Sequence, residues 1–231
     1  QRRERVFIVA SLDDAPRRVL FADEAGVPGD VLRTNGVACG FYWTEGVRGL
    51  GWAVDAVPTL KGGSTVGVPS PPAILMPDGD IVTPSLQDAE RLQGFPKDWT
   101  KNAESVGKRG MRWKLVGNAV NVPTVKWIAQ RLARPGEILD ARVERLASNG
   151  RWPRAAFNVG TGRYSIDMSA WPKHKPRQSL IEFVGDRGTP LSRRATAGFL
   201  SRTQRASLRF PEGFTDAVEA HLRRMEAAEA P

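Results

Sequence analysis

The sequence predicts an α/β fold, and three observations favour it. The apolar run VFIVA at residues 6–10 is typical of a strand buried on both faces of a parallel sheet. Residues 12–80 carry many turn signals, among them Asn35-Gly36, with short β-type segments and little helical periodicity. Two later segments, 83–100 and 123–133, instead place apolar residues at helical spacing.

Composition and charge limit the function classes. With 231 residues, 41% of them hydrophobic, the chain can hold one large or two modest domains around a globular core. No apolar run approaches membrane-spanning length, so no membrane partner is expected, and no signal-peptide pattern is present. The net charge of +9, carried mainly by Arg, suits nucleic acid as a partner, although a solvated basic surface would give the same balance.

Cysteine and histidine usage excludes two kinds of site. The single cysteine, Cys39, excludes an internal disulfide framework. The two histidines, His174 and His221, are far apart in the chain, which excludes a Cys/His zinc cluster. We therefore predict no metal site and expect a reducing cytoplasm as the compartment.

The segment 83–100 is predicted to be a helix with a defined start and end. Ser85 and Asp88 have the spacing of a capping box, in which each side chain bonds the other residue's backbone N–H. Gly94 and Pro96 end the helix, and Arg91 in its last turn meets the negative end of the helix dipole. The apolar side consists of Leu86, Ala89 and Leu92.

Residues 117–123 lead into a second predicted helix at 123–133. Pro123 suits a first helical turn, and the apolar face consists of Val125, Ile128, Ala129 and Leu132. A short helix is possible at 15–25, and 101–112 is predicted to be a polar, basic loop.

The tail of the chain follows a boundary near Pro135-Gly136 and is expected to be α+β. Its expected elements are a short helix at 139–147, alternating strands within 156–168, a strand at 180–184 and an Arg-rich helical part from Ser192.

The first residues combine charge alternation with the apolar run. Gln1, Arg3 and Arg5 fall on one side of an extended segment, so two guanidinium groups can converge. This pattern, followed by VFIVA, resembles the eighth motif of the C5-cytosine DNA methyltransferases. The resemblance implies that Arg5 hydrogen-bonds a flipped cytosine, that Arg3 supports the active-site network, and that Gln1 belongs with both to the clamp for the target base. The alternative is that these are solvated charges at the end of a strand.

Two later segments resemble further motifs of the same family, in family order. RLQGFP at 91–96 resembles the ninth motif, which implies that Asp88 and Arg91 hold the base of a DNA-recognition domain. Asp88 departs from the usual Glu but can still cap the helix. GNAV at 117–120 resembles the tenth motif and implies that Asn118 and Val120 contact S-adenosyl-L-methionine. Asn118 is also a plain N-cap candidate for the following helix.

The segment 12–80 lies where this family reads DNA sequence. Thr59-Leu60 resembles a family pair whose threonine fixes a backbone phosphate near the flipped base. The resemblance predicts two recognition loops, one at 45–49 and one from Lys61 to Ser64. Arg48 is a candidate for a guanine contact and Lys61 for a phosphate contact. The alternative for each residue is ordinary surface-loop charge.

Two family motifs are absent from the sequence. The nucleophilic cysteine lies in a Pro-Cys-Gln context in the family, and the main cofactor loop has the form Phe-x-Gly-x-Gly; neither occurs here. Cys39, in Ala-Cys-Gly, is a poor nucleophile candidate and is better explained as a small buried hydrophobe. Because the chain starts at Gln1 and enters a predicted strand at once, we expect a fragment or a subunit cut inside a domain.

Together these observations predict the C-terminal half of a DNA (cytosine-5-)-methyltransferase. The expected fold is the C-terminal part of a Rossmann-like methyltransferase domain (1–11 and 101–134), a small, mostly β target-recognition domain with its supporting helix (12–100), and an α+β C-terminal extension (135–231). S-adenosyl-L-methionine is the expected cofactor. Double-stranded DNA and the N-terminal half of the enzyme, in the same chain or a separate subunit, are the expected partners, in a prokaryotic or phage context at the nucleoid.

The half enzyme is expected to be inactive alone, because methyl transfer to C5 of a flipped cytosine needs the absent cysteine. Two alternatives remain open. The chain could be the natural β subunit of a split methyltransferase, or a non-catalytic DNA-binding remnant. For the tail, both extra grip on the DNA backbone and packing on the catalytic domain are compatible with the sequence.

Overall fold

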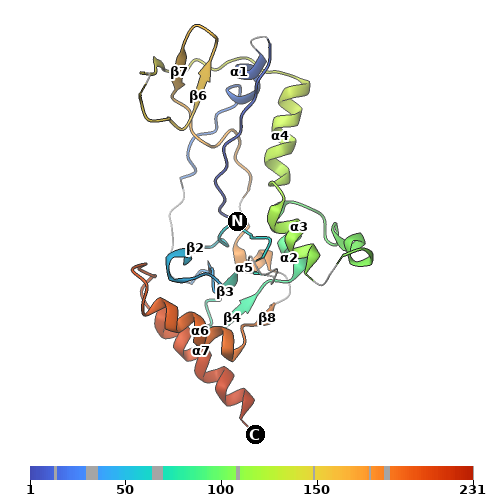
Figure 1. The fold of residues 1–231 in the computed structure, drawn as a ribbon, viewed down its shortest axis with the longest axis vertical. Coiled ribbons are helices and arrows are strands. Elements are labelled where there is room, and N and C mark those ends of the chain that lie inside the picture. The colour runs from blue at the N-terminus through green and yellow to red at the C-terminus, as the bar shows by residue number, and fades with distance from the viewer. Residues whose placement is uncertain are drawn as a thin grey trace. The chain divides into compact units, whose positions relative to one another are not determined.

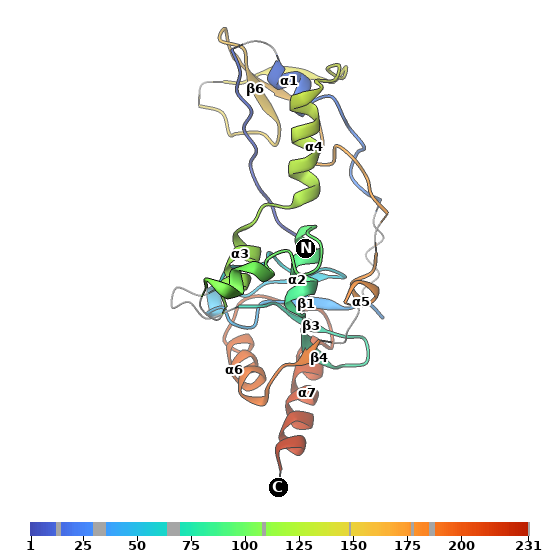
Figure 2. The ribbon, with the colours of Figure 1, turned by 90° about the vertical axis from the view of Figure 1, so that its right-hand side faces the viewer.

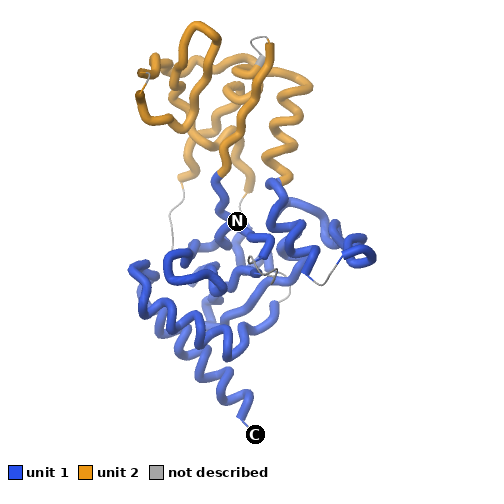
Figure 3. The backbone as a smooth tube through the Cα atoms, in the orientation of Figure 1, with its two compact units in different colours: residues 1–4, 32–121, 178–231 blue, residues 5–31, 122–177 orange. Residues whose placement is uncertain are grey.

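The structure is a computed structural model that describes residues 1–12, 15–29, 36–63, 70–107, 110–147, 149–176, 178–184 and 188–230. The chain forms two compact units, coloured separately in Figure 3. Unit 1 comprises residues 1–4, 32–121 and 178–231, and unit 2 comprises residues 5–31 and 122–177. Their mixed content confirms an α/β protein in the broad sense. Because every strand pair among the described residues is antiparallel, the Rossmann-like part stays a prediction.

Unit 1 is built on a five-stranded antiparallel sheet with the order β2-β1-β3-β4-β8. Gly40 at its centre pairs with Ala53 on one side and Ile74 on the other. A Cβ at Gly40 would lie 2.4 Å from the carbonyl oxygen of Ala56, so this close crossing requires glycine. The strands are β1 (Cys39–Phe41), β2 (Trp52–Val54), β3 (Ala73–Leu75), β4 (Ile81–Thr83) and β8 (Thr189–Pro190).

Both faces of this sheet are covered by helices, as Figures 1 and 2 show. Side chains alternate between the faces, so Val82 joins one apolar cluster and its neighbour Ile81 joins the other. The Val82 face is covered by α2 (Leu86–Gln93), α3 (Met111–Asn118) and α5 (Leu180–Phe183). The Ile81 face is covered by α6 (Arg193–Thr203) and α7 (Phe214–Glu229).

The last part of the tail is thus integral to unit 1. Phe41 of β1 stacks on Phe199 of α6, with ring centroids 4.6 Å apart, and meets Phe214 edge-on at 5.1 Å. On α7 the buried His221 accepts the N–H of Ile81 at Nδ1, at 3.2 Å, and donates from Nε2 to the Leu191 carbonyl at 2.9 Å. These contacts tie the tail to β1 by packing and to β4 by a hydrogen bond.

Unit 2 is smaller. It contains α1 (Ala15–Leu20), α4 (Val122–Ala133) and a three-stranded sheet of order β5-β7-β6, with strands Val143–Arg145, Arg163–Ile166 and Ala156–Asn158. Phe21, Ile166 and Met168 form its core. Asp23 accepts hydrogen bonds from Arg131 and Trp127 of α4, and the bond from Arg131 lowers the pKa of Asp23.

The two units cut across the boundaries expected from the sequence. The expected extension 135–231 divides, with 135–177 in unit 2 and 178–231 in unit 1. Residues 5–11 and 122–134, expected to belong to the catalytic part, lie in unit 2, whereas 101–121 lie in unit 1. Functional domains need not coincide with compact units, so the expected domain assignment stays a prediction.

The strand predicted at 6–10 is not formed. Residues 1–10 carry no strand, and Val6 and Ile8 are each 87% exposed. A strand needs a hydrogen-bonded neighbour, and none of the described strands pairs with this segment. The helix predicted at 123–133 is confirmed as α4, but its apolar face is not buried, since Val125 is 45% and Leu132 56% exposed.

Local signals decided most of the other elements. The capping box of α2, the helix from Ser192 and the strands within 156–168 are confirmed, and α1 forms the first part of the possible helix at 15–25. The strand predicted at 180–184 is wrong, because the capping box of Ser179 and Glu182 starts helix α5 there. The helix predicted at 139–147 is also wrong, because pairing with β7 makes 143–145 a strand.

The loop predicted at 101–112 is partly wrong, because Lys101–Ser105 forms a short 3-10 helix, η2, and Met111 begins α3. Among the described residues, no helix combines the length and apolar character needed to cross a bilayer.

Phe199→Ala tests whether the tail belongs to the sheet's core. We expect the free energy of unfolding to fall by about 3–5 kcal/mol, because Phe199 is fully buried against Phe41 and Phe214. Leu208→Ala, on a tail residue that is 37% exposed, should stay within about 0.5 kcal/mol of the wild type. Urea unfolding followed by circular dichroism measures both, and equal effects of the two changes would contradict the assignment.

Candidate functional site

The site begins with helix α2 and the side chain at its end. Ser85 and Asp88 form the capping box, and Gly94 closes the helix in the left-handed conformation, with φ 90°. This frame places Gln93 in the last turn, where it is fully buried. Its Nε2 donates to the carbonyl of Val116 at 2.7 Å and to that of Ala119 at 3.3 Å. A buried amide needs such partners, so Gln93 fixes α2 to the C-terminal end of α3.

The first three residues join the same place. Nη1 of Arg3 donates to the carbonyls of Gly117 and Ala119, at 3.0 and 2.9 Å. The Gln1 side chain donates from Nε2 to Oε1 of Gln93 and accepts the N–H of Leu60 at 3.1 Å. We call this set, formed by Gln1, Arg3, Gln93 and the carbonyls at 116, 117 and 119, the motif junction. It brings together residues of all three segments that resemble family motifs.

The segment around Thr59 lies beside the motif junction. The N–H of Arg2 donates to the Val57 carbonyl at 2.9 Å, and the Thr59 hydroxyl donates to the Arg2 carbonyl at 2.9 Å. Thr59 is therefore held at the edge of the motif junction, and its hydroxyl is hydrogen-bonded within the chain.

A close backbone contact joins the following loop to α3. A Cβ at Gly117 would lie 2.1 Å from the backbone nitrogen of Gly62 and 2.2 Å from the carbonyl carbon of Lys61. A Cβ at Gly62 would lie 2.9 Å from Oδ1 of Asn118. Glycine is required at position 117 because its neighbours there are backbone atoms, so the loop that carries Lys61 rests on the end of α3.

The two predicted recognition loops contact each other through Lys61. Its Nζ lies 3.0 Å from Oε1 of Glu45 and 4.2 Å from the centre of the Tyr42 ring. The Tyr42 hydroxyl donates to the Thr59 carbonyl at 2.8 Å. Arg48 is exposed on the short 3-10 helix η1 (Val47–Gly49). Ser64 lies outside the described residues.

The predicted cofactor contacts lie at the same end of α3. Asn118 is the last residue of α3, a helix that the sequence did not indicate, so the N-cap interpretation of its role is wrong. The helix predicted to follow it is α4, which starts at Val122. The Asn118 side chain and Val120, which is 41% exposed, both reach the surface. Two cavities, of about 360 and 440 Å³, are lined by other residues.

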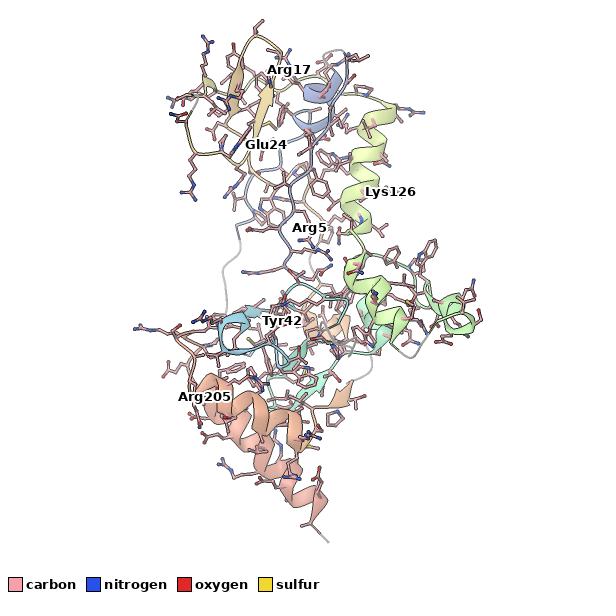
Figure 4. All side chains as sticks on the ribbon, in the orientation of Figure 1. Arg5, Arg17, Glu24, Tyr42, Lys126 and Arg205 are labelled. Carbon is pink, nitrogen blue, oxygen red and sulfur yellow. The ribbon has the colours of Figure 1, made fainter. Side chains whose placement is uncertain are left out.

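Arg5 belongs to unit 2, whereas Gln1 and Arg3 belong to unit 1. Arg5 is exposed and is labelled in Figure 4. The convergence of Arg3 and Arg5 on one target therefore stays a prediction.

A buried ionic network next to α2 was missed by sequence reasoning. Glu90 is fully buried and accepts hydrogen bonds from the Thr100 N–H at 2.9 Å and from Nη2 of Arg112 at 3.1 Å. Nη2 of Arg112 also donates to Asp98 at 3.0 Å. Although burial opposes it, these bonds from Thr100 and Arg112 hold the pKa of Glu90 below its usual value.

This network fixes the loop that follows RLQGFP onto α3. It therefore supports the helix whose end carries the carbonyls of the motif junction. Arg91 extends the support, donating to the carbonyl of Phe183 at 2.8 Å while its guanidinium lies 4.3 Å from the Phe183 ring centre. No local sequence signal could have revealed this network or the Arg91 contact. The partners within the network are 8 to 22 residues apart, and Arg91 and Phe183 are 92 residues apart.

Cys39 is unsuited to nucleophilic chemistry. It lies in β1 and packs in the apolar cluster under α6 and α7. Burial raises the pKa of its thiol to about 11, so almost no thiolate forms at neutral pH. The geometry agrees with the role of a small buried hydrophobe.

Relatives of known class exist for this chain. Residues 83–134, which include the α2 and α4 segments, match the family described as C-5 cytosine-specific DNA methylase. The chain is 43% identical, over 231 residues and 95% of its length, to the Type II methyltransferase M2.BsuMI of Bacillus subtilis (strain 168). It covers 58% of that relative, somewhat over half of its length. No solved structure matches the chain.

Gly117→Ala tests the contact between α3 and the Lys61 loop. We expect a loss of about 1–3 kcal/mol in the free energy of unfolding, because the new Cβ meets backbone atoms that cannot rotate away. Gly198→Ala in α6 is the matched control, since its Cβ meets only a flexible Arg202 nitrogen at 3.4 Å. The control should be neutral or more stable by up to about 1 kcal/mol. Chemical unfolding would contradict the contact if both variants gained stability.

Proposed function

The chain belongs to the C5-cytosine-specific DNA methylase family, and from that premise we propose that it is the C-terminal part of a DNA (cytosine-5-)-methyltransferase. The observation that supports this most is the motif junction, where Gln1, Arg3, Gln93 and the end of α3 are joined by hydrogen bonds. Residues that resemble three separate family motifs thus meet in one structural unit. The methyltransferase activity belongs to a longer assembly, because the chain covers 58% of its relative.

In this proposal the parts of the chain divide the work of DNA recognition. Gln1, Arg3 and Arg5 form the clamp for a cytosine flipped out of the duplex. Arg3 is held rigidly at the carbonyls of Gly117 and Ala119, which suits a positioning role more than direct contact with the base. Arg5, exposed and two residues further on, is the better candidate for the base contact.

DNA reading is assigned to the region 12–100 and its two loops. Thr59 and Lys61 are proposed phosphate contacts, Arg48 is a proposed guanine contact, and Ser64 is a further proposed DNA-binding residue of the second loop. Because Lys61 is paired with Glu45 at 3.0 Å, a phosphate has to compete with that carboxylate. Arg48 is exposed and has no such acid partner among the described residues, so it needs no prior rearrangement.

The cofactor of the proposed enzyme is S-adenosyl-L-methionine, which supplies the methyl group. Asn118 and Val120 fit one wall of its site, since an amide and an apolar side chain both reach the surface beside the motif junction. The remaining wall, with the Phe-x-Gly-x-Gly loop, has to come from another segment. The same holds for the Pro-Cys-Gln cysteine that attacks C6 of the cytosine.

The proposed partner for these missing functions is the N-terminal part of the enzyme, in the same chain or a separate subunit. Unit 2 offers two apolar surfaces for it. One is the unpaired segment with Val6 and Ile8, each 87% exposed, and the other is the face of α4 with Val125 and Leu132. Exposed apolar side chains such as these favour association over contact with water. Without the partner the chain should be inactive and of low stability.

Co-expression with an N-terminal part that carries the Pro-Cys-Gln segment tests the proposed activity. We expect incorporation of tritiated methyl groups into duplex DNA above the level of either part alone. The matched control replaces the partner's cysteine by alanine and should abolish incorporation. Incorporation no higher than that control would instead favour the non-catalytic DNA-binding remnant.

Similarity to a bacterial Type II methyltransferase supports placing the chain in a restriction-modification system, in the cytoplasm and at the nucleoid of a prokaryote. The genomic reading frame separates the two forms of the partner. A frame that continues upstream of Gln1 into a Pro-Cys-Gln segment would exclude a separate β subunit. A start codon close to Gln1 would support one.

Arg5→Ala tests the proposed clamp in the reconstituted enzyme. Methylation should be lost while most of the duplex affinity remains, because Arg5 is assigned to the flipped base and not to the backbone. Arg2→Ala is the control: its side chain is exposed, only its backbone atoms contact the Thr59 segment, and it should keep both activities. Loss of affinity and methylation in equal measure for Arg5→Ala would contradict its role.

A further inference from the structure

The turn between α6 and α7 lies against the hairpin loop that carries Arg48. The indole N–H of Trp52 donates to the Arg209 carbonyl at 3.0 Å, and Nη2 of Arg202 donates to the Trp43 carbonyl. Trp43 and Trp52 flank the loop 44–51, and both also pack in the apolar cluster of α6 and α7. Two segments that are more than 150 residues apart in sequence therefore form one end of unit 1.

Arginines on the α6–α7 pair fall into two groups. At the far end of the pair Arg193 is bound to Glu229 at 2.6 Å, and on α7 Arg224 is bound to Asp80 at 3.2 Å. At the turn, Arg202, Arg205 and Arg209 have no ion pair with any carboxylate in the described part of the chain, and the same holds for Arg48. Figure 4 labels Arg205 at the end of α6.

This concentration of unpaired charge is unfavourable for the isolated protein. Nε of Arg202 is buried without a hydrogen-bond partner. Burial, and after it the charge of Arg205, lowers the pKa of the Arg202 guanidinium. An anion at the turn would relieve the repulsion between these charges, and Arg is the residue best suited to bind phosphate oxygens.

We propose that the α6–α7 turn, through Arg205 and Arg209, binds backbone phosphates of duplex DNA and extends the surface that begins at Arg48. This inference rests on the proposed function, because it takes DNA as the partner. It gives helices α6 and α7 two roles, as the cover of one face of the sheet and as a part of the DNA-binding surface. Arg202 acts differently: it holds the Trp43 carbonyl and so positions the loop.

The salt dependence of DNA binding by the full chain tests the proposal. The variant R205Q/R209Q is compared with R194Q/R223Q, which removes the same charge from positions on the same two helices away from the turn. All four arginines are exposed, so both variants should keep the fold, as thermal unfolding would check. Fluorescence anisotropy with a labelled duplex of about 30 base pairs gives affinities between about 50 and 200 mM salt.

We expect the slope of log K against log salt to become less steep by about 1.8 in R205Q/R209Q, since each lost phosphate contact removes about 0.9. The slope of R194Q/R223Q should equal that of the wild type. Equal changes in both variants would overturn the proposal in favour of a general charge effect, and no change in R205Q/R209Q would overturn it in favour of another acidic partner. If the wild-type chain failed to bind duplex at all, the proposed function would fall as well.

Discussion

The carbonyl groups at the C-terminal end of α3 are the constraint on which unit 1 depends. A helix leaves its last carbonyls without internal donors, and here those at 116 and 117, with the following one at 119, receive Gln93 and Arg3. Because these donors come from α2 and from the first residues of the chain, satisfying one helix end fixes three segments. The glycine contact between 62 and 117 then seats the Lys61 loop on the same helix. Residues of the three motif segments, the predicted phosphate contact Lys61 and the predicted cofactor contact Asn118 are thereby grouped around one set of backbone groups.

The tail changes how the DNA-reading region is understood. If only the Val82 face of the sheet were covered, Phe41 and Ile81 on the other face would be exposed to water. Helices α6 and α7 prevent this exposure. The region expected to read DNA is therefore completed by the tail: β8 and His221, each more than 100 positions beyond β4, bind directly to β4. The same helices carry arginines to the end of the unit where Arg48 lies, so stability and the proposed DNA contact share one element.

The elements that could be predicted from the sequence are those specified by residues close together in the chain. The Ser85–Asp88 capping box and Gly94 specify α2 within ten positions, and the structure has that helix as expected. The strand at 6–10 depended on partners that its own residues do not encode, and the helix α5 was missed although Ser179 and Glu182 repeat the same capping signal. Gln93 and Arg3 could be assigned to motifs, but their meeting at the end of α3 depends on contacts across 23 to 116 positions, which no local pattern contains.

The two-sided cover of the sheet also has a consequence for how the protein is made. Strands β1 to β4 leave the ribosome well before α7, whose last residue follows Thr83 by about 150 positions. At about 5–20 residues per second the apolar face around Phe41 stays uncovered for roughly 7 to 30 s during synthesis. Long-range closure of this kind slows folding, and the uncovered face is a natural target for chaperones and a hazard for aggregation. Truncation of the tail would make that transient exposure permanent.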